Sequence, residues 1–401
     1  MTGFKRFRGD EQMFEVAQRM EKLSTGIFSE MEAHKRIVEA KGLKVINLGI
    51  GSPDQPPGEH IKAALIKGIN KDENYRYPVF EGRLDVREAV ARWYWGRFGV
   101  QLDPEQEVLL LMGSQDGLAH LAWAYINPGD IALVPDPGYP IYSASILLAG
   151  CEIYPMPLLE ERRFLPDLAA IPEGVARKAK LMLLNYPSNP VAAVADAAFF
   201  REAVEFGKKY NVLICHDAAY SELAFDGFKP MSFLEVEGSK DVGIEFHSCS
   251  KTFNMAGCRI GFVVGKAEVI QNLNKIKSNI DYGVFTTVQE AAMVALDGPQ
   301  EFVWENADAY QRRRDVLVDG LAKVGWPIPK PKGSMFLWAK IPPGFSSSMA
   351  FSIELLEKAG VLVIPGNAFG GQGEGYVRIA LTQTEEQLQQ VVERIGKNFT
   401  F

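Results

Sequence analysis

The 401-residue sequence has few of the features that bind a metal ion or a nucleic acid. Its five histidines are scattered, without the spacing of a zinc site. The formal net charge is −7, and the basic cluster of Lys5, Arg6 and Arg8 is followed directly by Asp10 and Glu11. A nucleic-acid partner would require a basic face. The sequence therefore predicts neither a resident metal ion nor a nucleic-acid partner.

Features of secreted and membrane proteins are also missing. No apolar run approaches the roughly eighteen residues of a membrane helix, and Met1 is not followed by the apolar core of a signal peptide. We therefore expect a cytoplasmic protein with no membrane partner. The four cysteines form no C-x-x-C pair and are predicted to be reduced thiols in the core: Cys151, Cys215, Cys249 and Cys258.

What the sequence does contain is typical of a folded α/β protein. Hydrophobic residues make up 47% of the chain and charged residues 23%, and the chain is long enough for two domains. Segments with helical spacing, such as 116–125 and 196–210, separate short runs that are apolar throughout. Continuous apolar runs indicate strands of a parallel sheet covered on both faces. The runs occupy residues 108–112, 131–136, 180–186, 211–217 and 243–248.

This pattern predicts two domains of different architecture. A large, doubly wound α/β domain with a mostly parallel sheet is expected over residues 51–295. Residues 296–401 contain a long helical stretch, short apolar segments and a final amphipathic helix, which indicate a smaller α+β domain. Residues 1–50 are expected to form an N-terminal arm and part of that small domain.

Polar residues stand directly after each apolar run. In an open α/β sheet, ligands bind beyond the carboxyl ends of the strands. The first run leads to Gly113, Ser114 and Gln115 at the start of a helix, where free N–H groups and the helix dipole favour an anion. Each residue taken singly also fits a helix cap or a turn, whereas five such strand ends together favour a binding site. The other runs lead to Tyr139, to Ser188 and Asn189, to Asp217 with Tyr220, and to Ser248, Ser250 and Lys251.

Several of these residues suit a phosphate group. Phosphate is bound by N–H donors, hydroxyl groups and the planar fork of an arginine. The turn that begins at Gly113 offers the N–H donors, and Ser114, Ser248 and Ser250 offer hydroxyls. Arg259, a few residues after Lys251, offers the guanidinium group. The sequence therefore predicts a phosphorylated ligand.

The remaining residues suit a planar ring that carries an aldehyde. Asp217 would keep a ring nitrogen protonated, because a neighbouring anion favours the charged form. Asn189 and Tyr220 would contact a ring phenolate, and Tyr139 would stack on the ring face. Lys251 would be the amine that reacts with the aldehyde, for which a lowered pKa is needed. Together with the phosphate site, these residues predict pyridoxal 5'-phosphate as the cofactor.

Eight segments then identify a family. They are INLGIGSPD, YRYPVFEGRLDVREAVARWY, LLMGSQDGLAH, PDPGYPIY, NYPSNP, HDAAYSEL, HSCSKTFNMAGCRIG and GYVRIAL. Over nearly its whole length the chain resembles the class I/II aminotransferases of the fold-type I pyridoxal-phosphate-dependent family. Within that family, NYPSNP, HDAAYSELAFDG, VGIEFHS and KSNIDYGVF are most similar to the bacterial LL-diaminopimelate aminotransferase branch.

The resemblance implies roles for further residues. Lys251 would be the Schiff-base lysine, and with Asp217 and Tyr220 it would form the catalytic set. Arg378 would bind the substrate α-carboxylate, with Asn189 and the backbone lip at Ile50 and Gly51 beside it. Tyr77 would reach the phosphate site of a neighbouring subunit, so a homodimer with shared active sites is implied. Gly113, Ser114, Gln115, Tyr139, Ser248, Ser250 and Arg259 would complete the cofactor site.

Two segments depart from the family pattern. The usual Asn-Pro-Thr-Gly turn reads Asn189-Pro190-Val191-Ala192, and the common Thr-Gly-Trp-Arg reads Ala256-Gly257-Cys258-Arg259. Both changes flank expected cofactor contacts without removing one. They bear on the branch of the family and hence on the substrate.

The predicted reaction is amino transfer from an L-amino acid to a 2-oxo acid in two half-reactions. One alternative is a carbon–sulfur β-lyase on the same scaffold. A second is a non-catalytic regulator that senses the cofactor; it would require a DNA-binding domain, and the segment before INLGIG is too short and too weakly basic for one.

The substrate is predicted from an absence. Aminotransferases for dicarboxylates usually place a second arginine on the distal carboxylate, and residues 277–285 contain none. They contain Lys277, a point charge without the planar fork, and Asp281 and Tyr282, which with Glu81 would accept hydrogen bonds. We therefore expect aspartate to be a poor donor. LL-diaminopimelate or a neutral amino acid such as alanine is the expected donor, with 2-oxoglutarate or pyruvate as acceptor.

Overall fold

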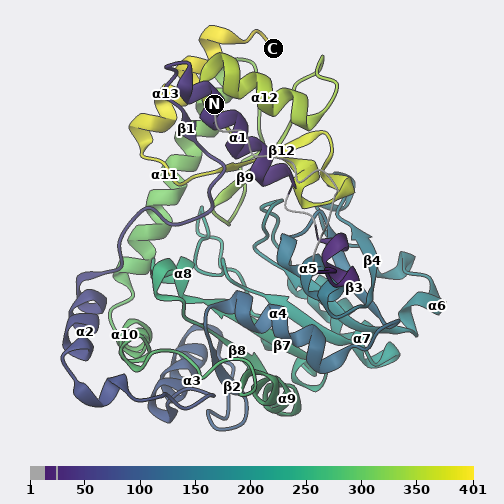
Figure 1. The fold of residues 1–401 in the computed structure, drawn as a ribbon, viewed down its shortest axis with the longest axis vertical. Helices are drawn as coiled ribbons and strands as arrows, with labels where there is room; N and C mark the ends of the chain where they lie inside the picture. The colour runs from purple at the N-terminus through teal and green to yellow at the C-terminus, as the bar shows by residue number, and fades with distance from the viewer. Residues whose placement is uncertain (1–13, 24–25) are drawn as a thin grey trace.

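The computed structural model describes residues 14–23 and 26–401. The basic residues Lys5, Arg6 and Arg8 lie outside the described residues. Figure 1 shows a large sheet flanked by helices and, beyond one side of it, a second group of helices and short strands. Within the described part of the chain, no helix combines the length and the apolar character needed to cross a lipid bilayer.

The large sheet has seven strands in the order β2-β8-β7-β6-β5-β3-β4. All neighbouring pairs from β7 to β4 are parallel, and only β8 pairs antiparallel, with β2 and β7. The predicted doubly wound, mostly parallel sheet is thereby confirmed. The strands are β2 (Val108–Leu111), β3 (Ile131–Asp136), β4 (Glu152–Pro157), β5 (Ala179–Asn185), β6 (Leu213–Asp217), β7 (Gly243–Ser248) and β8 (Gly261–Gly265).

Helices cover both faces of this sheet, which explains why its strands are apolar throughout. Along β5, Met182 and Leu184 enter one core with residues of α3, α7 and α10. Leu181 and Leu183, on the opposite face, enter another core with residues of α4, α5 and α9. The helices of this part are α2 (Glu59–Ile69), α3 (Leu84–Phe98), α4 (Ser114–Tyr125), α5 (Pro140–Leu148), α6 (Glu173–Ala176), α7 (Ala197–Tyr210), α8 (Cys249–Thr252), α9 (Ala267–Lys277) and α10 (Thr286–Asp297).

The second group of elements has its own core. Ile46 and Leu48, near the start of the described chain, pack there with residues 310–395, and also with Tyr220 and its neighbours. The division at residues 50/51 and 295/296 stays a prediction. The strands here are β1 (Ile46–Asn47), β9 (Phe336–Lys340), β10 (Val361–Leu362), β11 (Ile364–Pro365) and β12 (Tyr376–Ala380), and the helices are α1 (Gly26–Ala40), α11 (Glu301–Lys323), α12 (Ser348–Ala359) and α13 (Glu385–Asn398).

Candidate active site

A cavity of about 650 Å³ lies at the carboxyl ends of the large sheet, where the second group of elements meets it. Strand and helix ends supply most of its wall, as expected for an open α/β sheet. The segment around Gly51, Arg378 of β12 and the aromatic residues Phe28, Phe336 and Phe369 also contribute. Of the predicted site residues, the following line it: Ile50, Gly51, Ser114, Gln115, Tyr139, Asn189, Asp217, Tyr220, Ser248, Ser250, Lys251, Arg259 and Arg378.

Lys251 stands on α8, the short helix that begins immediately after β7. Its Nζ donates a hydrogen bond to the carbonyl oxygen of Gly51, at 2.8 Å. Burial lowers the pKa of Lys251 to about 8, and the charges of Arg378 and Arg259 act in the same direction. About half of the Lys251 side chains are therefore neutral, nucleophilic amines at pH 8, and about a tenth at pH 7.

Asp217 ends β6 and is only 5% exposed. Its Oδ2 accepts a hydrogen bond from the Tyr142 hydroxyl at 2.7 Å, and its Oδ1 accepts one from the N–H of Ala219 at 3.1 Å. Burial raises the pKa of Asp217, and the bond from Tyr142 opposes that shift. A cation placed beside the carboxylate would lower the pKa again, so the site suits a protonated ring nitrogen.

The start of α4 lies beside the guanidinium group of Arg259. Gly113 precedes this helix with φ +81°, and a Cβ added there would lie 2.5 Å from Nη2 of Arg259. A side chain would fill the space in which the guanidinium group sits. Ser114 begins the helix, and Ser248 and Ser250 lie on the same cavity wall. Free N–H groups, hydroxyls and a guanidinium fit the phosphate of pyridoxal phosphate.

Arg378 lies on β12 and is 5% exposed. Its Nη1 donates to Oδ1 of Asn189 at 2.9 Å and its Nη2 to the carbonyl oxygen of Gly49 at 2.7 Å. Its buried Nε has no hydrogen-bond partner among the described residues, and burial lowers the pKa of this arginine to about 10. The group fits a carboxylate that enters the cavity, because the desolvated guanidinium gains a charged acceptor.

Several residues that contact the predicted site were not singled out from the sequence, among them Phe336, Phe369, Asn185 and Tyr142. The rings of Phe336 and Phe369 lie 4.3 and 4.6 Å from the guanidinium carbon of Arg378. Asn185 donates to the carbonyl oxygen of Asp217 at 2.7 Å and accepts from the N–H of Asn189 at 2.7 Å. Tyr142 follows the predicted Tyr139 by three residues, and the two rings are in edge contact. That one-turn spacing on α5 was the available signal for Tyr142.

Comparison with known proteins decides the family. The family model described as aminotransferase class I and II matches residues 43–395. The chain is a class I and II aminotransferase. It belongs to the pyridoxal-phosphate-dependent transaminases, and the fold, enzyme class and cofactor predicted from the sequence are confirmed. Neither the β-lyase nor the regulator is favoured by its relatives.

Two curated relatives of the aminotransferase are named LL-diaminopimelate aminotransferase. The protein of Moorella thermoacetica is 51% identical, over 95% of this chain and 97% of its own. The protein of Halothermothrix orenii is 49% identical, over 95% and 98%. Among solved structures, apo-BacF from Bacillus subtilis has a TM-score of 0.93 at 43% identity, covering 97% of this chain and 99% of that one.

One predicted residue of the aminotransferase lies outside the cavity formed by a single chain. Tyr77 is 84% exposed, and its ring lies 4.8 Å from that of Tyr282. The structure therefore does not bring Tyr77 together with the cofactor residues of its own chain. Its expected role in a neighbouring subunit stays a prediction.

The interpretation of Lys277 as a cation available to a substrate was wrong. Lys277 is only 1% exposed, and its Nζ lies 2.5 Å from Oδ1 of Asp281 and 3.4 Å from Oδ2 of Asp116. The two residues neutralise each other because they are one helical turn apart at the end of α9. Spacing alone did not show that their side chains point toward each other.

Proposed function

We propose that this aminotransferase moves the amino group of LL-diaminopimelate, or of a neutral amino acid such as alanine, to 2-oxoglutarate or pyruvate in two half-reactions. The names of its close relatives support LL-diaminopimelate. One observation carries the proposal. A lysine amine with a lowered pKa and a buried arginine with an unpartnered Nε line the same cavity.

We assign roles from the contacts described above. Bound pyridoxal phosphate supplies an electron sink that makes the substrate α-proton removable. Arg378 binds the substrate carboxylate and fixes the amino acid in one orientation. Lys251, as a neutral amine, accepts the α-proton and returns it to the cofactor side. Asp217 holds the ring nitrogen, and Asn189 connects Arg378 to the end of β5 through Asn185.

The donor class follows from the charges near the cavity. Residues 277–285 contain no arginine, and Lys277 is neutralised by two carboxylates. This segment therefore offers no free cation to a distal carboxylate. Aspartate would place the charge of its distal carboxylate without a partner, which costs several-fold or more in specificity, whereas the distal carboxylate of LL-diaminopimelate stands beside an ammonium group of its own.

A panel of donors tests the proposal. The kcat/KM values of LL-diaminopimelate, alanine and aspartate are measured with 2-oxoglutarate and with pyruvate. The kcat/KM of LL-diaminopimelate or of alanine should exceed that of aspartate by about tenfold or more, because aspartate leaves one polar contact without a partner. The Lys251→Ala variant serves as the background. Aspartate as the best donor by tenfold, or equal rates in Lys251→Ala, would contradict the proposal.

We further propose that the enzyme is a homodimer with shared sites. Tyr75, Tyr77, Tyr282 and Phe285 are 64%, 84%, 58% and 40% exposed, and their rings contact one another in pairs. Clustered aromatic rings exposed on a surface are typical of an interface. A second copy of the chain would cover them and would bring its Tyr77 to the phosphate site.

We propose the cytoplasm as its location. The four cysteines are all free thiols in the described structure, which is typical of a reducing compartment. Fractionation of cells should recover the enzyme with cytoplasmic markers, and recovery in an oxidising compartment would contradict this.

A further inference from the structure

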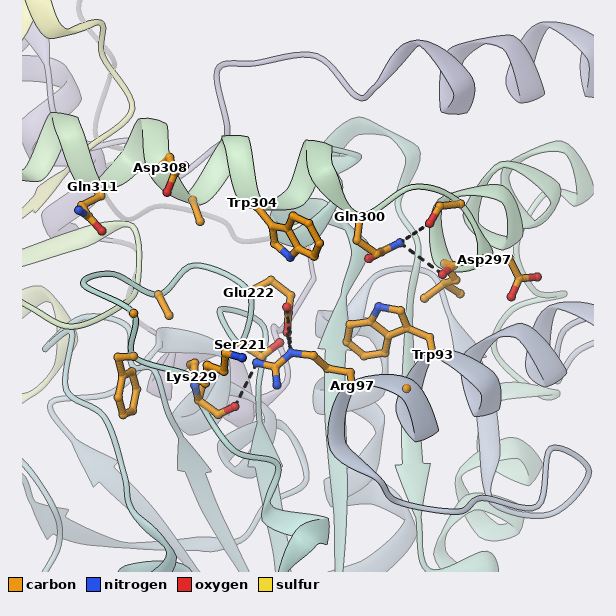
Figure 2. Close-up of a pocket in the computed structure, with 18 of the residues that line it drawn as sticks. Trp93, Arg97, Ser221, Glu222, Lys229, Asp297, Gln300, Trp304, Asp308 and Gln311 are labelled. Atoms are coloured by element: carbon orange, nitrogen blue, oxygen red, sulfur yellow. Dashed lines mark hydrogen bonds and ion pairs between the residues drawn. The ribbon is translucent and has the colours of Figure 1, made fainter.

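A second and larger cavity, of about 770 Å³, lies between α3, the segment 221–230 and the first half of α11. It shares no lining residue with the candidate active site, yet the two are separated by one short stretch of chain. Ala219 and Tyr220 line the active-site cavity, and Ser221 and Glu222 line the second one. Figure 2 shows its labelled side chains converging from these three elements and from the end of α10.

The charges of this cavity balance. Its lining includes three basic and three acidic side chains. Two pairs are already made: Arg97 Nε lies 3.1 Å from both carboxylate oxygens of Glu222, and Arg92 lies 2.8 Å from Asp297. Lys229 and Asp308 remain. Neither side chain has an ion pair or hydrogen bond to any residue that the structure describes.

These two free charges come from opposite walls. Lys229 belongs to the segment 221–230, and Asp308 projects from α11 beside Trp304 (Figure 2). A ligand that satisfies both must carry an anion and a cation separated by several bonds. A net-neutral lining favours a ligand that is itself neutral overall, since an excess charge would meet an unpaired like charge.

Apolar surface fills the space between the charges. Trp304 is 62% exposed beside the cavity, and Trp93 lies on another wall. Indole faces bind methylene chains and also attract cations.

We propose that this cavity binds a small zwitterion whose carboxylate and ammonium are joined by a flexible apolar chain. The carboxylate pairs with Lys229, the ammonium pairs with Asp308, and the chain lies on Trp304. This site goes beyond the transaminase activity, and its ligand does not enter the catalytic cavity.

The experiment measures binding to the holoenzyme by equilibrium dialysis, with 6-aminohexanoate as the probe. This compound has separated charges and no α-amino group. Hexanoate and hexylamine serve as analogues with one charge each. Saturable binding of 6-aminohexanoate is expected, and each analogue should bind about two- to fivefold more weakly, the contribution of an exposed ion pair. Because no turnover is needed, the result does not depend on the donor proposed above.

Variants locate the bound probe. Lys229→Gln and Asp308→Asn should each weaken binding about two- to fivefold, and Trp304→Ala about fivefold or more. Two changes are matched controls and should leave the dissociation constant unaltered. Trp95→Ala removes an indole that is 61% exposed on α3 but does not line the cavity. Glu305→Gln removes a carboxylate of α11 that lines a different pocket.

Three outcomes would overturn the proposal. The first is the absence of saturable binding of 6-aminohexanoate. The second is binding of hexanoate or hexylamine as tight as that of the zwitterion. The third is binding that Arg378→Ala abolishes and Trp304→Ala leaves unchanged, which would place the probe in the catalytic cavity.

Discussion

Lys251 has a depressed pKa because it is buried and lies near two guanidinium groups, while Asp217 opposes them with a single negative charge. The same two cations also contact other residues. Arg378 donates a hydrogen bond to Asn189, and Arg259 lies against Gly113. Each therefore acts on Lys251 while occupying a separate binding position. At the scale of single residues, the site combines ligand binding with electrostatic tuning of one amine.

The titration of Lys251 tests this coupling. In the cofactor-free enzyme, its rate of modification by an amine reagent should rise with a midpoint near pH 8, the value to which burial and the two arginines lower its pKa. Peptide mapping over a pH series measures the rate at this residue. Arg378→Met should move the midpoint upward, because it removes one of the cations.

Arg312→Gln is the matched control, since this arginine pairs with Glu385 at an exposed site. The midpoint of the Arg312→Gln variant should equal that of the wild-type enzyme. A midpoint at the ordinary lysine value of 10.5 would contradict the prediction.

Replacing Asp217 should separate cofactor binding from turnover. Asp217→Ala should retain measurable binding of pyridoxal phosphate but reduce kcat by orders of magnitude, because the ring nitrogen loses the anion that keeps it protonated. Tyr142→Phe removes only the hydrogen bond of 2.7 Å to this carboxylate and should lower kcat about tenfold. Tyr154→Phe, at a half-buried position on β4, is the control. Near-normal turnover in Asp217→Ala would exclude the assigned role.

The sequence indicated residues with a chemical role more readily than residues that support them. Lys251, Asp217 and Arg378 carry charges that are costly to bury, and they stand in recognisable motifs. Phe336 and Asn185 have no such mark. An aromatic ring in an apolar strand and an asparagine before a turn fit ordinary packing and capping equally well. Their contacts depend on how distant strands meet, and one sequence does not contain that geometry.

At the scale of elements, β6 and β7 are joined behind the site by a buried polar network. Glu245 is fully buried and accepts from His216 at 2.7 Å, His247 at 2.9 Å and Ser232 at 2.7 Å. His216 and His247 directly precede Asp217 and Ser248. Because successive residues of a strand point to opposite faces, the network fixes the two strand ends from the side away from the cavity.

Glu245→Leu should therefore destabilise the protein strongly. Five donors would lose their acceptor, including the Tyr94 hydroxyl and the N–H of Phe233, and breaking a buried ionic network costs about 3–5 kcal/mol. Urea unfolding of the holoenzyme measures the change. Glu235→Gln, at an exposed residue that caps the same segment, should cost about 1 kcal/mol or less. Equal losses in the two variants would contradict the prediction.

The pH dependence of this effect has a definite sign. Burial raises the pKa of Glu245, but the hydrogen bonds from His216 and His247 outweigh it and hold the pKa far below the ordinary 4.5. A depressed carboxyl pKa contributes stability above the unfolded value, and that stability is lost as the pH falls. The difference in free energy of unfolding between the wild type and Glu245→Leu should therefore be largest near neutral pH and should shrink below about pH 4.5.

For the molecule as a whole, apolar runs predicted five strands of the large sheet and missed the other two, β4 and β8. β4 contains two prolines and only one buried residue, and it lies at the edge of the sheet. β8 is a short strand between glycines, inserted antiparallel between β2 and β7. Neither has the long apolar run of a central parallel strand. The pairing of β1 with β10, far apart in the chain, likewise requires the folded structure.

The proposed homodimer with shared catalytic sites leads to a prediction that only the whole assembly can test. Tyr77→Phe and Lys251→Ala are each expected to impair the enzyme, but a hybrid dimer would hold one site with neither change, provided that each Tyr77 serves the other subunit. After complete subunit exchange in an equal mixture, half of the dimers are hybrids with one intact site of two, so roughly a quarter of wild-type activity should return. A mixture of Lys251→Ala and Lys251→Arg is the control, because no combination of its subunits restores the lysine. If exchange is confirmed by mass spectrometry and activity stays at the level of the parent variants, Tyr77 acts within its own chain or not at all.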